Sequence, residues 1–197
     1  MALLERVRRS PIIAAVRDLR DLRRALASTV PAVFLLVGDI NSLPRCVLAA
    51  REAGKEILVH LDLIDGLGRD RAGVEFLARS VRPDGVITTR SNLIQAAKRE
   101  GLFTIQRVFM LDSLSYRTAA EAVRSTGPDA VECLPGIIPR VISEFAREVS
   151  VPVVAGGMVK TAEEVRAALA AGAVAVSVSE QRLWGMLRAT EESEPSA

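Results

Sequence analysis

Two pairs of small residues stand where apolar runs end near the end of the chain. Gly156 and Gly157 follow the run VPVVA, and Ser177 and Ser179 close the run AGAVAVSVS. Backbone N–H groups can approach an anion only where side chains are small, and a helix starting just afterwards directs its positive dipole end at the same place. Ordinary loop chemistry is the alternative, since glycine is common after strands. The matched pairs favour a pocket for the phosphate group of a small molecule.

Polar side chains gather at the ends of the other apolar runs as well. The set mixes acids, bases and amides: Arg17, Asp39, Asn41, His60, Asp62, Arg90, Gln106, Arg107 and Glu132. A dense rim of mixed sign is typical of a site for a polar ligand. Arg90 could hold a phosphate or carboxylate through two hydrogen bonds, or form an ordinary salt bridge at a helix start.

His60, Asp62 and Glu132 have the ligand chemistry of a divalent cation site. His60 and Asp62 stand two residues apart on an expected strand and so face the same way, and carboxylates with one imidazole would suit magnesium or manganese. In the alternative interpretation, His60 is a core residue and Asp62 pairs with a neighbouring arginine. Glu132 could act as a general base, or pair with Arg107 or Arg90. We expect no metal, because structural ion pairs are common among such residues.

No pattern marks a catalytic nucleophile, and we assign no catalytic residue. A Schiff-base mechanism needs a lysine near the inner end of a strand. The three lysines lie before a strand, within a helix and in a loop: Lys55, Lys98 and Lys160. Cys133 should point away from Glu132. The alternative function is a small enzyme that uses Asp62 or Glu132 as acid or base on a phosphorylated three-carbon or sugar substrate, with or without magnesium.

Eight β-rich runs alternate with helical patterns and would position these residues. The expected strands are 11–16, 32–37, 56–61, 85–89, 103–108, 129–134, 151–155 and 173–178. Nearly continuous apolar runs are typical of parallel strands buried on both faces, and their spacing of about 22–27 residues leaves room for one helix each. Eight such units predict an α/β fold, a TIM-barrel-like (β/α)8 single domain, whose functional groups lie at the carboxyl ends of the strands. No GxGxxG follows the first strand, which weighs against dinucleotides.

Glycines and short polar residues punctuate this pattern. Candidate helix stops are Gly54, Gly101, Gly127 and Gly172, and candidate N-caps are Ser42, Asp70, Ser91, Ser113 and Thr161. Glu164 stands at the position that completes a capping box with Thr161.

Composition agrees with one domain. The chain has 197 residues and a formal charge of +2, and we expect the barrel over residues 1–189 with a disordered polar tail over 190–197. We expect no signal peptide, because no charged start followed by a long apolar run occurs, and no membrane span, because no apolar run of about 20 residues occurs. We expect a cytoplasmic location.

The sequence resembles the glycerol uptake operon antiterminator regulatory protein family. The matching segments are FLLVGDI (34–40), HLDLIDGL (60–67), RPDGVITTRSN (82–92), TIQRVFMLDSLS (104–115), VECLPGIIP (131–139), VPVVAGGMVKT (151–161) and AGAVAVSVS (171–179). The resemblance implies a TIM-barrel-like fold that senses glycerol 3-phosphate without any further cofactor. It also implies binding to the leader of a messenger RNA, so that transcription continues into glycerol-uptake genes. It does not imply an enzymatic reaction.

The resemblance also implies site residues. The ligand phosphate would meet Gly156, Gly157, Ser177 and Ser179. The glycerol hydroxyls would lie in a polar pocket made by Asp62, Arg90, Gln106 and Glu132.

Arginines are the candidates for RNA contact. We expect Arg17, Arg20 and Arg24 to share one helix face, which could bind phosphates. Asp18 and Asp21 lie between them, so a salt-bridged, solvated helix is the alternative.

No stacking platform for RNA bases stands out. Phe109 falls at the end of a strand run, which leaves Tyr116 and Trp184 as stacking candidates, and both suit packing better. The Leu-rich start of the chain hints at self-association, so a homo-oligomer is one expectation.

Overall fold

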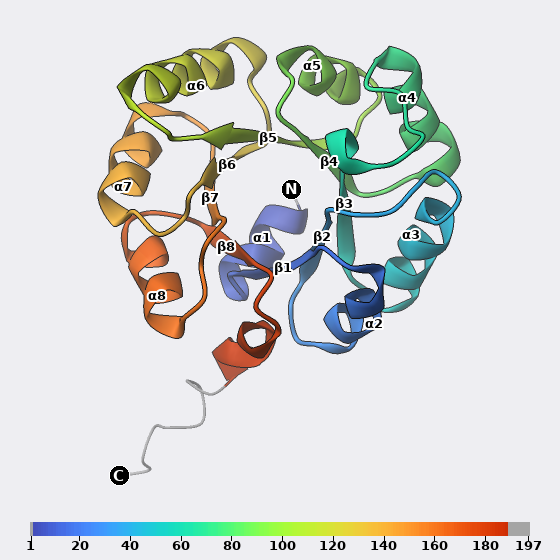
Figure 1. Ribbon diagram of the computed structural model, residues 1–197, viewed down its shortest axis with the longest axis horizontal. Helices are drawn as coiled ribbons and strands as arrows, with labels where there is room; N and C mark the ends of the chain where they lie inside the picture. Colours follow the sequence, from blue (N-terminus) through green and yellow to red (C-terminus); the bar gives the residue numbers. More distant parts are fainter. Residues whose placement is uncertain (1, 189–197) are drawn as a thin grey trace.

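Eight parallel strands close into a barrel in which each strand pairs with its sequence neighbours and β8 pairs with β1 (Figure 1). The strands are β1 (Ile12–Val16), β2 (Ala32–Leu35), β3 (Glu56–His60), β4 (Gly85–Thr88), β5 (Phe103–Phe109), β6 (Ala130–Leu134), β7 (Val153–Gly156) and β8 (Ala175–Val178). Each strand overlaps the apolar run predicted for it, and the (β/α)8 prediction is confirmed. This computed structural model describes residues 2–188, and the tail expected over 190–197 lies outside them.

Helices form a ring around the barrel (Figure 1). They are α2 (Leu19–Ala27), α3 (Leu43–Glu52), α4 (Arg71–Phe76), α5 (Ser91–Arg99), α6 (Ser113–Thr126), α7 (Pro139–Glu148) and α8 (Ala162–Ala170). Three further helical segments are the 3-10 helices η1 (Leu61–Leu63) and η3 (Gln181–Arg188) and the π-helical η2 (Leu77–Val81). Among residues 2–188, no helix combines the length and apolar character needed to cross a membrane.

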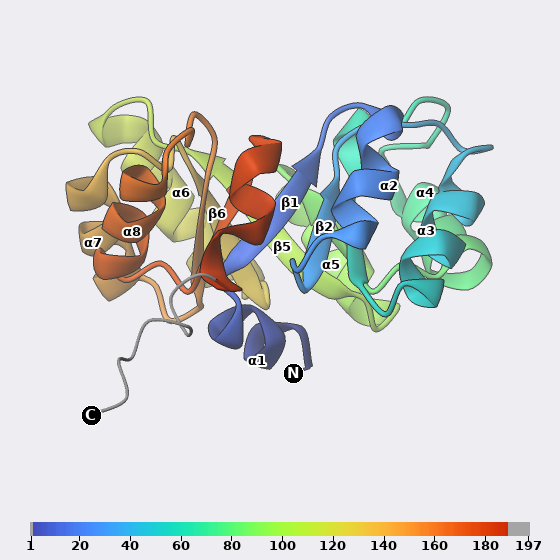
Figure 2. The same ribbon diagram turned by 90° about the horizontal axis from the view of Figure 1, so that it is seen from below.

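A helix that the sequence patterns did not predict, α1 (Ala2–Arg9), lies across the amino-terminal end of the barrel (Figure 2). Leu3 and Val7 lie four residues apart, on one helix face, and both are buried in the inner core. The Leu-rich start of the chain therefore covers the barrel's own end, which removes the sequence argument for self-association.

The helices begin and end near the predicted N-caps and helix stops, with three differences at the N-caps. Asp70 caps α4, and Thr161 and Glu164 form a reciprocal capping box at α8. Ser91 and Ser113 are first helical residues, preceded by the N-cap residues Arg90 and Asp112, and Ser42 caps without a side-chain bond to its helix. A carboxylate accepts the exposed N–H groups of a first turn as well as a hydroxyl does, which explains the shift at α6.

The core has an inner and an outer layer. Inside the barrel lie Ile13, Phe34, Leu58, Ile87, Ile105 and Val154. The outer layer, between strands and helices, holds mostly valine, leucine and alanine. Because side chains alternate along a strand, the next inward positions toward the carboxyl ends include the polar residues His60, Thr89 and Arg107. Some of these positions contribute to the site described below.

Candidate functional site

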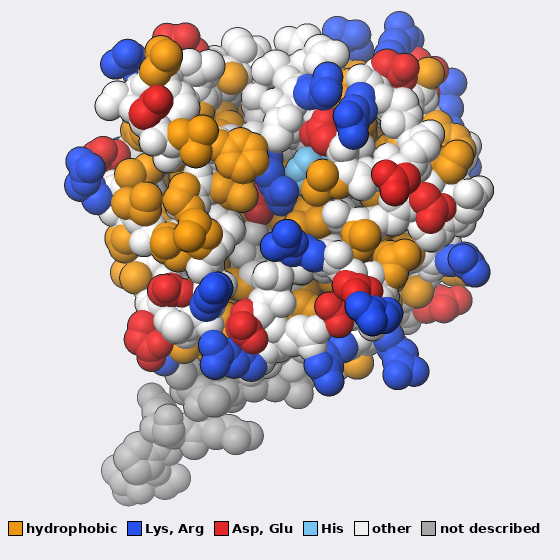
Figure 3. All heavy atoms as spheres, viewed as in Figure 1, with side chains coloured by type: hydrophobic (Ala, Val, Ile, Leu, Met, Phe, Trp, Pro, Cys, Tyr) orange, Lys and Arg blue, Asp and Glu red, His pale blue; other side chains and the backbone are white. Residues whose placement is uncertain are grey.

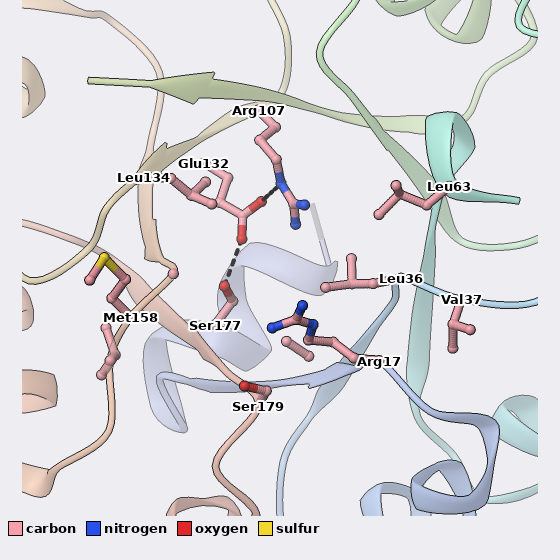
Figure 4. A pocket seen from close by; sticks show the side chains of 13 residues that line it. Arg17, Leu36, Val37, Leu63, Arg107, Glu132, Leu134, Met158, Ser177 and Ser179 are labelled. Atoms are coloured by element: carbon pink, nitrogen blue, oxygen red, sulfur yellow. Dashed lines mark hydrogen bonds and ion pairs between the residues drawn. The ribbon is translucent and has the colours of Figure 1, made fainter. Parts of the chain in front are cut away.

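A cavity of about 470 Å³ opens at the carboxyl ends of the strands (Figures 3 and 4). Its lining comes from strands β1, β5, β6 and β8, from the segments that follow β1, β2, β7 and β8, and from η1. The lining residues are Ala15, Arg17, Leu36, Val37, Leu63, Arg107, Glu132, Leu134, Gly157, Met158, Val159, Ser177 and Ser179. The volume suits a small polar molecule. This is the face of a TIM barrel on which functional sites lie.

A buried carboxylate forms the inner end of the cavity. Glu132 is 1 % exposed, and its Oε2 accepts a hydrogen bond of 2.6 Å from Arg107 Nε. Its Oε1 accepts a second bond of 2.6 Å from the hydroxyl of Ser177 (Figure 4). Arg107 and Glu132 are direct neighbours in the β5–β6 register. Of the roles considered for Glu132, pairing with Arg107 is the one that the structure has.

Gly156 makes this arrangement possible. It pairs with Ser177 across β7 and β8, and a Cβ at this position would come within 2.5 Å of Glu132 Oε1 and 2.6 Å of Ser177 Oγ. Real Cβ atoms do not tolerate such distances. The glycine thus leaves room for a hydrogen bond between two side chains, and Gly156 itself is not part of the cavity lining.

Arg17 supplies an unpaired positive charge. It follows β1 directly, and its side chain points into the cavity (Figure 4). Within the part of the chain that the structure describes, Arg17 has no carboxylate partner and no side-chain hydrogen bond. With Arg107 and Glu132 compensating one another, the cavity carries a net positive charge. An arginine without a partner beside a cavity is a ready binding group for a phosphate or carboxylate.

The loop after β7 completes the cavity wall. Gly157 and Met158 both have left-handed backbones, with φ of +77° and +66°. For a non-glycine residue this conformation costs about 1–2 kcal/mol, and such strain is concentrated at ligand sites. Turns with left-handed residues create backbone concavities that bind anions. Ser179 adds a hydroxyl to the same wall.

Asp62 and Arg90, both predicted for the polar pocket, lie outside this cavity and bind each other. Asp62 leaves the strand in η1, so its carboxylate reaches the next strand, where it accepts bonds from Thr88 Oγ1 at 2.8 Å, Thr89 N at 2.9 Å and Arg90 Nε at 3.1 Å. Burial raises the pKa of Asp62, but the bonds from Thr89 and Thr88 outweigh it and the net pKa is lowered. The pairing of Asp62 with a neighbouring arginine is the alternative that the structure bears out.

Gln106 lies on the other side of its strand. Ile105 and Arg107 point inward, so Gln106 points toward the helices. Its Nε2 donates to Ser91 Oγ at 3.2 Å, and its Oε1 accepts from Thr126 Oγ1 at 2.6 Å. These contacts place it behind the barrel wall, away from the cavity for which it was predicted.

His60 is a core residue, as one of the two interpretations held. It is 2 % exposed, and its Nδ1 lies 3.8 Å from Asp62 Oδ2 and has no hydrogen-bond partner in the described part of the chain. Burial and the positive charge of Arg107 lower the pKa of His60 to about 4. Among residues 2–188, no three His, Cys, Asp or Glu side chains gather as metal ligands would.

The three arginines predicted to share a helix face do not do so. Arg17 precedes α2 because Asp18 is the N-cap, whose side chain accepts from the N–H of Arg20. The Arg20 guanidinium also pairs with Asp18, and Arg24 donates to Gln181. The salt-bridged alternative therefore describes Arg20, while Arg17 belongs to the cavity.

Tyr116 and Trp184 are packing residues, as predicted, whereas Phe109 is more exposed than its place in a strand run suggested. Phe109, at the end of β5, is 47 % exposed and lies beside Leu111, which is 80 % exposed. Trp184 is buried, and its Nε1 donates a hydrogen bond to Val178 O. Tyr116 packs edge-on against Phe145, with the two ring centroids 5.5 Å apart. Figure 3 shows apolar side chains gathered on the side of the mouth where β5, β6 and β7 end.

Arg107 and Met158 are among the cavity residues that sequence reasoning did not assign to the ligand site. Arg107 was seen as a rim residue but not assigned to the pocket, although its position two residues after the inward Ile105 carried that signal. Met158 gave no signal, because its left-handed backbone has no marker in the sequence.

Comparison with known proteins places these features in a family. Residues 12–184 match the family model described as glycerol-3-phosphate responsive antiterminator. The glycerol uptake operon antiterminator regulatory protein of Listeria monocytogenes str. 4b F2365 is 36% identical, with a TM-score of 0.85 over 88% of this chain and 94% of that one. A glycerol uptake operon antiterminator-related protein of Thermotoga maritima MSB8 is 33% identical, with a TM-score of 0.79 over 88% and 96%.

A relative without a described function extends this comparison to nearly the whole chain. The uncharacterized protein YgcP of Escherichia coli K12 is 34% identical over 188 residues, which are 95% of this chain and 98% of the relative. The resemblance found in the sequence is thus confirmed, and this chain belongs to the glycerol-3-phosphate responsive antiterminator family.

Proposed function

We propose that this chain is a regulator that binds glycerol 3-phosphate in the mouth cavity and, in response, acts on the leader of a messenger RNA so that transcription continues into glycerol-uptake genes. The observation that carries the ligand half is Arg17, a cation that points into the cavity with no partner among the described residues. Family membership supports the choice of ligand and the RNA half.

The phosphate group would lie between Arg17, the loop at Gly157 and Met158, and Ser179. A doubly charged phosphate there gains charge-assisted hydrogen bonds to a guanidinium and to backbone N–H groups. The glycerol end would extend inward, where Glu132 accepts hydrogen bonds. Of the four residues predicted to contact the phosphate, Gly157 and Ser179 would do so directly. Ser177 would hold Glu132, and Gly156 would leave room for that hydrogen bond.

We place the RNA contact on the same face of the barrel. Exposed Phe109 offers a flat surface on which a base can stack. Arg90, whose side chain is half exposed, is paired with Asp62 through its Nε and adds its other guanidinium N–H groups to this face as donors. A contact there would lie beside the ligand cavity, and filling the cavity could then change the RNA site directly.

Isothermal titration calorimetry with glycerol 3-phosphate, without added metal, tests the ligand half. Arg17→Met should weaken binding at least tenfold, because a hydrogen bond to a charged group contributes about 1.5–3 kcal/mol. Arg23→Met, an exposed arginine on α2, is the matched control and should bind as the wild type does.

Wild-type affinity that survives Arg17→Met unchanged would contradict this placement of the phosphate. Binding that requires magnesium, together with turnover of the ester, would instead favour the alternative, a small enzyme acting on a phosphorylated substrate. The proposal involves no cofactor.

A further inference from the structure

The two ends of the cavity differ in charge. Arg17 stands on one side with no partner among residues 2–188, and the buried carboxylate of Glu132 forms the inner end (Figure 4). We propose that the inner end is a hydroxyl-recognition subsite that admits phosphorylated polyols and rejects phosphorylated acids of the same length. This inference rests on the proposed function and adds the chemical class of ligand that the site excludes.

Glu132 has acceptor capacity to spare. An ionised carboxylate offers about four acceptor positions, and the structure uses two of them, one for Arg107 Nε and one for the Ser177 hydroxyl. Glu132 is almost completely buried but lines the cavity, so a ligand can reach the remaining positions from the cavity. A ligand hydroxyl directed at Glu132 would fill one of them.

Ser177 links the inner end to the phosphate side. Its hydroxyl has one proton, which it donates to Glu132 Oε1. If a phosphate oxygen approaches, the hydroxyl can turn that proton toward the phosphate, and Oε1 is then free to accept a hydroxyl of the ligand. After this exchange the Ser177 hydroxyl binds the phosphate, and Glu132 Oε1 replaces the lost hydrogen bond only if the ligand itself supplies a donor.

A second acid group on the ligand reverses this outcome. A carboxylate at the inner end has no proton to give, so it would face Glu132 as a like charge in a site shielded from water. Arg107 compensates the charge of Glu132 through the 2.6 Å bond from its Nε. A second carboxylate would leave the inner end with a net negative charge, even if it accepted a bond from another N–H group of Arg107. A cavity of about 470 Å³ has room for a three-carbon phosphate ester with or without a carboxylate. Charge, and not size, therefore decides which ester binds.

Calorimetry of the wild type with three esters of one chain length tests the inference. The esters are glycerol 3-phosphate, n-propyl phosphate, which lacks the hydroxyls, and 3-phosphoglycerate, which carries a carboxylate. We expect n-propyl phosphate to bind at least tenfold more weakly than glycerol 3-phosphate, and 3-phosphoglycerate at least a hundredfold more weakly. Glu132→Gln should narrow the gap between glycerol 3-phosphate and 3-phosphoglycerate to less than tenfold.

Glu144→Gln, on the outer face of α7, is the matched control and should keep the wild-type ratios. A thermal melt of Glu132→Gln checks that it folds, and the wild-type series alone still decides if it does not. The inference is overturned if 3-phosphoglycerate or n-propyl phosphate binds the wild type as tightly as glycerol 3-phosphate, or if folded Glu132→Gln keeps the hundredfold gap. If none of the three esters binds, the proposed function fails as well.

Discussion

At the scale of residues, partners decide what each charged side chain can do. Arg107 and Arg17 both line the cavity, but Arg107 is committed to Glu132 and Arg17 has no partner within residues 2–188. Asp62, which has the same chemistry as a ligand-binding acid, is occupied by four donors from Thr88, Thr89 and Arg90. A residue's type therefore says less about its role than the count of its unused hydrogen-bonding positions.

His60 predicts a pH dependence of stability. Burial and Arg107 lower the pKa of His60 to about 4, whereas an unfolded histidine titrates near 6.5. Between these two values the unfolded chain takes up a proton that the folded chain does not. The free energy of unfolding should therefore fall as pH drops from about 6.5 to about 4, by at most about 3 kcal/mol, and not further below.

Urea unfolding across this pH range, on wild type and His60→Gln, measures the effect. Because carboxylates titrate in the same range, the difference between the two proteins is the decisive quantity. The free energy of unfolding of His60→Gln should fall less steeply as the pH drops, because the contribution of His60 is missing. Parallel pH profiles for the two proteins would mean that His60 is not held neutral.

At the scale of elements, the loop after β6 supports the loop after β7. The N–H of Gly136 donates to Gly156 O at 2.6 Å and to Gly157 O at 3.1 Å. A Cβ at Gly136 would lie 2.7 Å from the backbone N of Gly156, and backbone atoms cannot move aside as a flexible side chain can. Gly136 thus fixes how closely the loop after β6 approaches the loop that carries Met158.

Gly136→Ala should lower the free energy of unfolding by about 1–3 kcal/mol, as forced overpacking does, and weaken glycerol 3-phosphate binding. Gly185→Ala is the control, because nothing lies within 4 Å of a Cβ there and its φ is not left-handed. It should change stability by no more than about 0.5 kcal/mol. Chemical denaturation and calorimetry check both effects, and equal stability of the two variants would contradict the contact.

Elements were easier to predict than the site. All eight strands appear in the apolar runs, because parallel strands buried on both faces leave a strong signal. The same double burial hides which face is inward. Gln106 and Arg107 are both polar, and they can be told apart only once another residue, such as Ile105 or Glu132, is known to point inward. Arg17 was placed on a helix because the cap at Asp18 was not recognised. The family resemblance supplied the proposed ligand, glycerol 3-phosphate, which the spacing of the site residues in the sequence does not specify.

At the scale of the whole molecule, the barrel mouth brings the ligand cavity and the exposed Phe109 to one face. If glycerol 3-phosphate raises RNA affinity, RNA must raise glycerol 3-phosphate affinity by the same factor. Gel-shift titrations with the leader transcript, at fixed salt, should show a change of about 5- to 150-fold with saturating ligand. RNA affinity that ignores the ligand would contradict the coupling.

Phe109→Ala should weaken RNA binding by about 1–3 kcal/mol, the range for a lost base–aromatic stack, while leaving ligand binding unchanged. Phe76→Ala is the matched control, since Phe76 is also partly exposed but lies on α4. Gel shifts with both variants locate the RNA surface. Equal RNA binding by Phe109→Ala and the wild type would exclude the β5 end as a stacking site.

A crystal structure of the chain grown with glycerol 3-phosphate tests the central claim most directly. The account predicts phosphate density between Arg17, Gly157 and Ser179, with the glycerol hydroxyls directed at Glu132. Density with the phosphate against Glu132, a ligand bound at Arg90 instead, or an empty cavity at saturating ligand would contradict it.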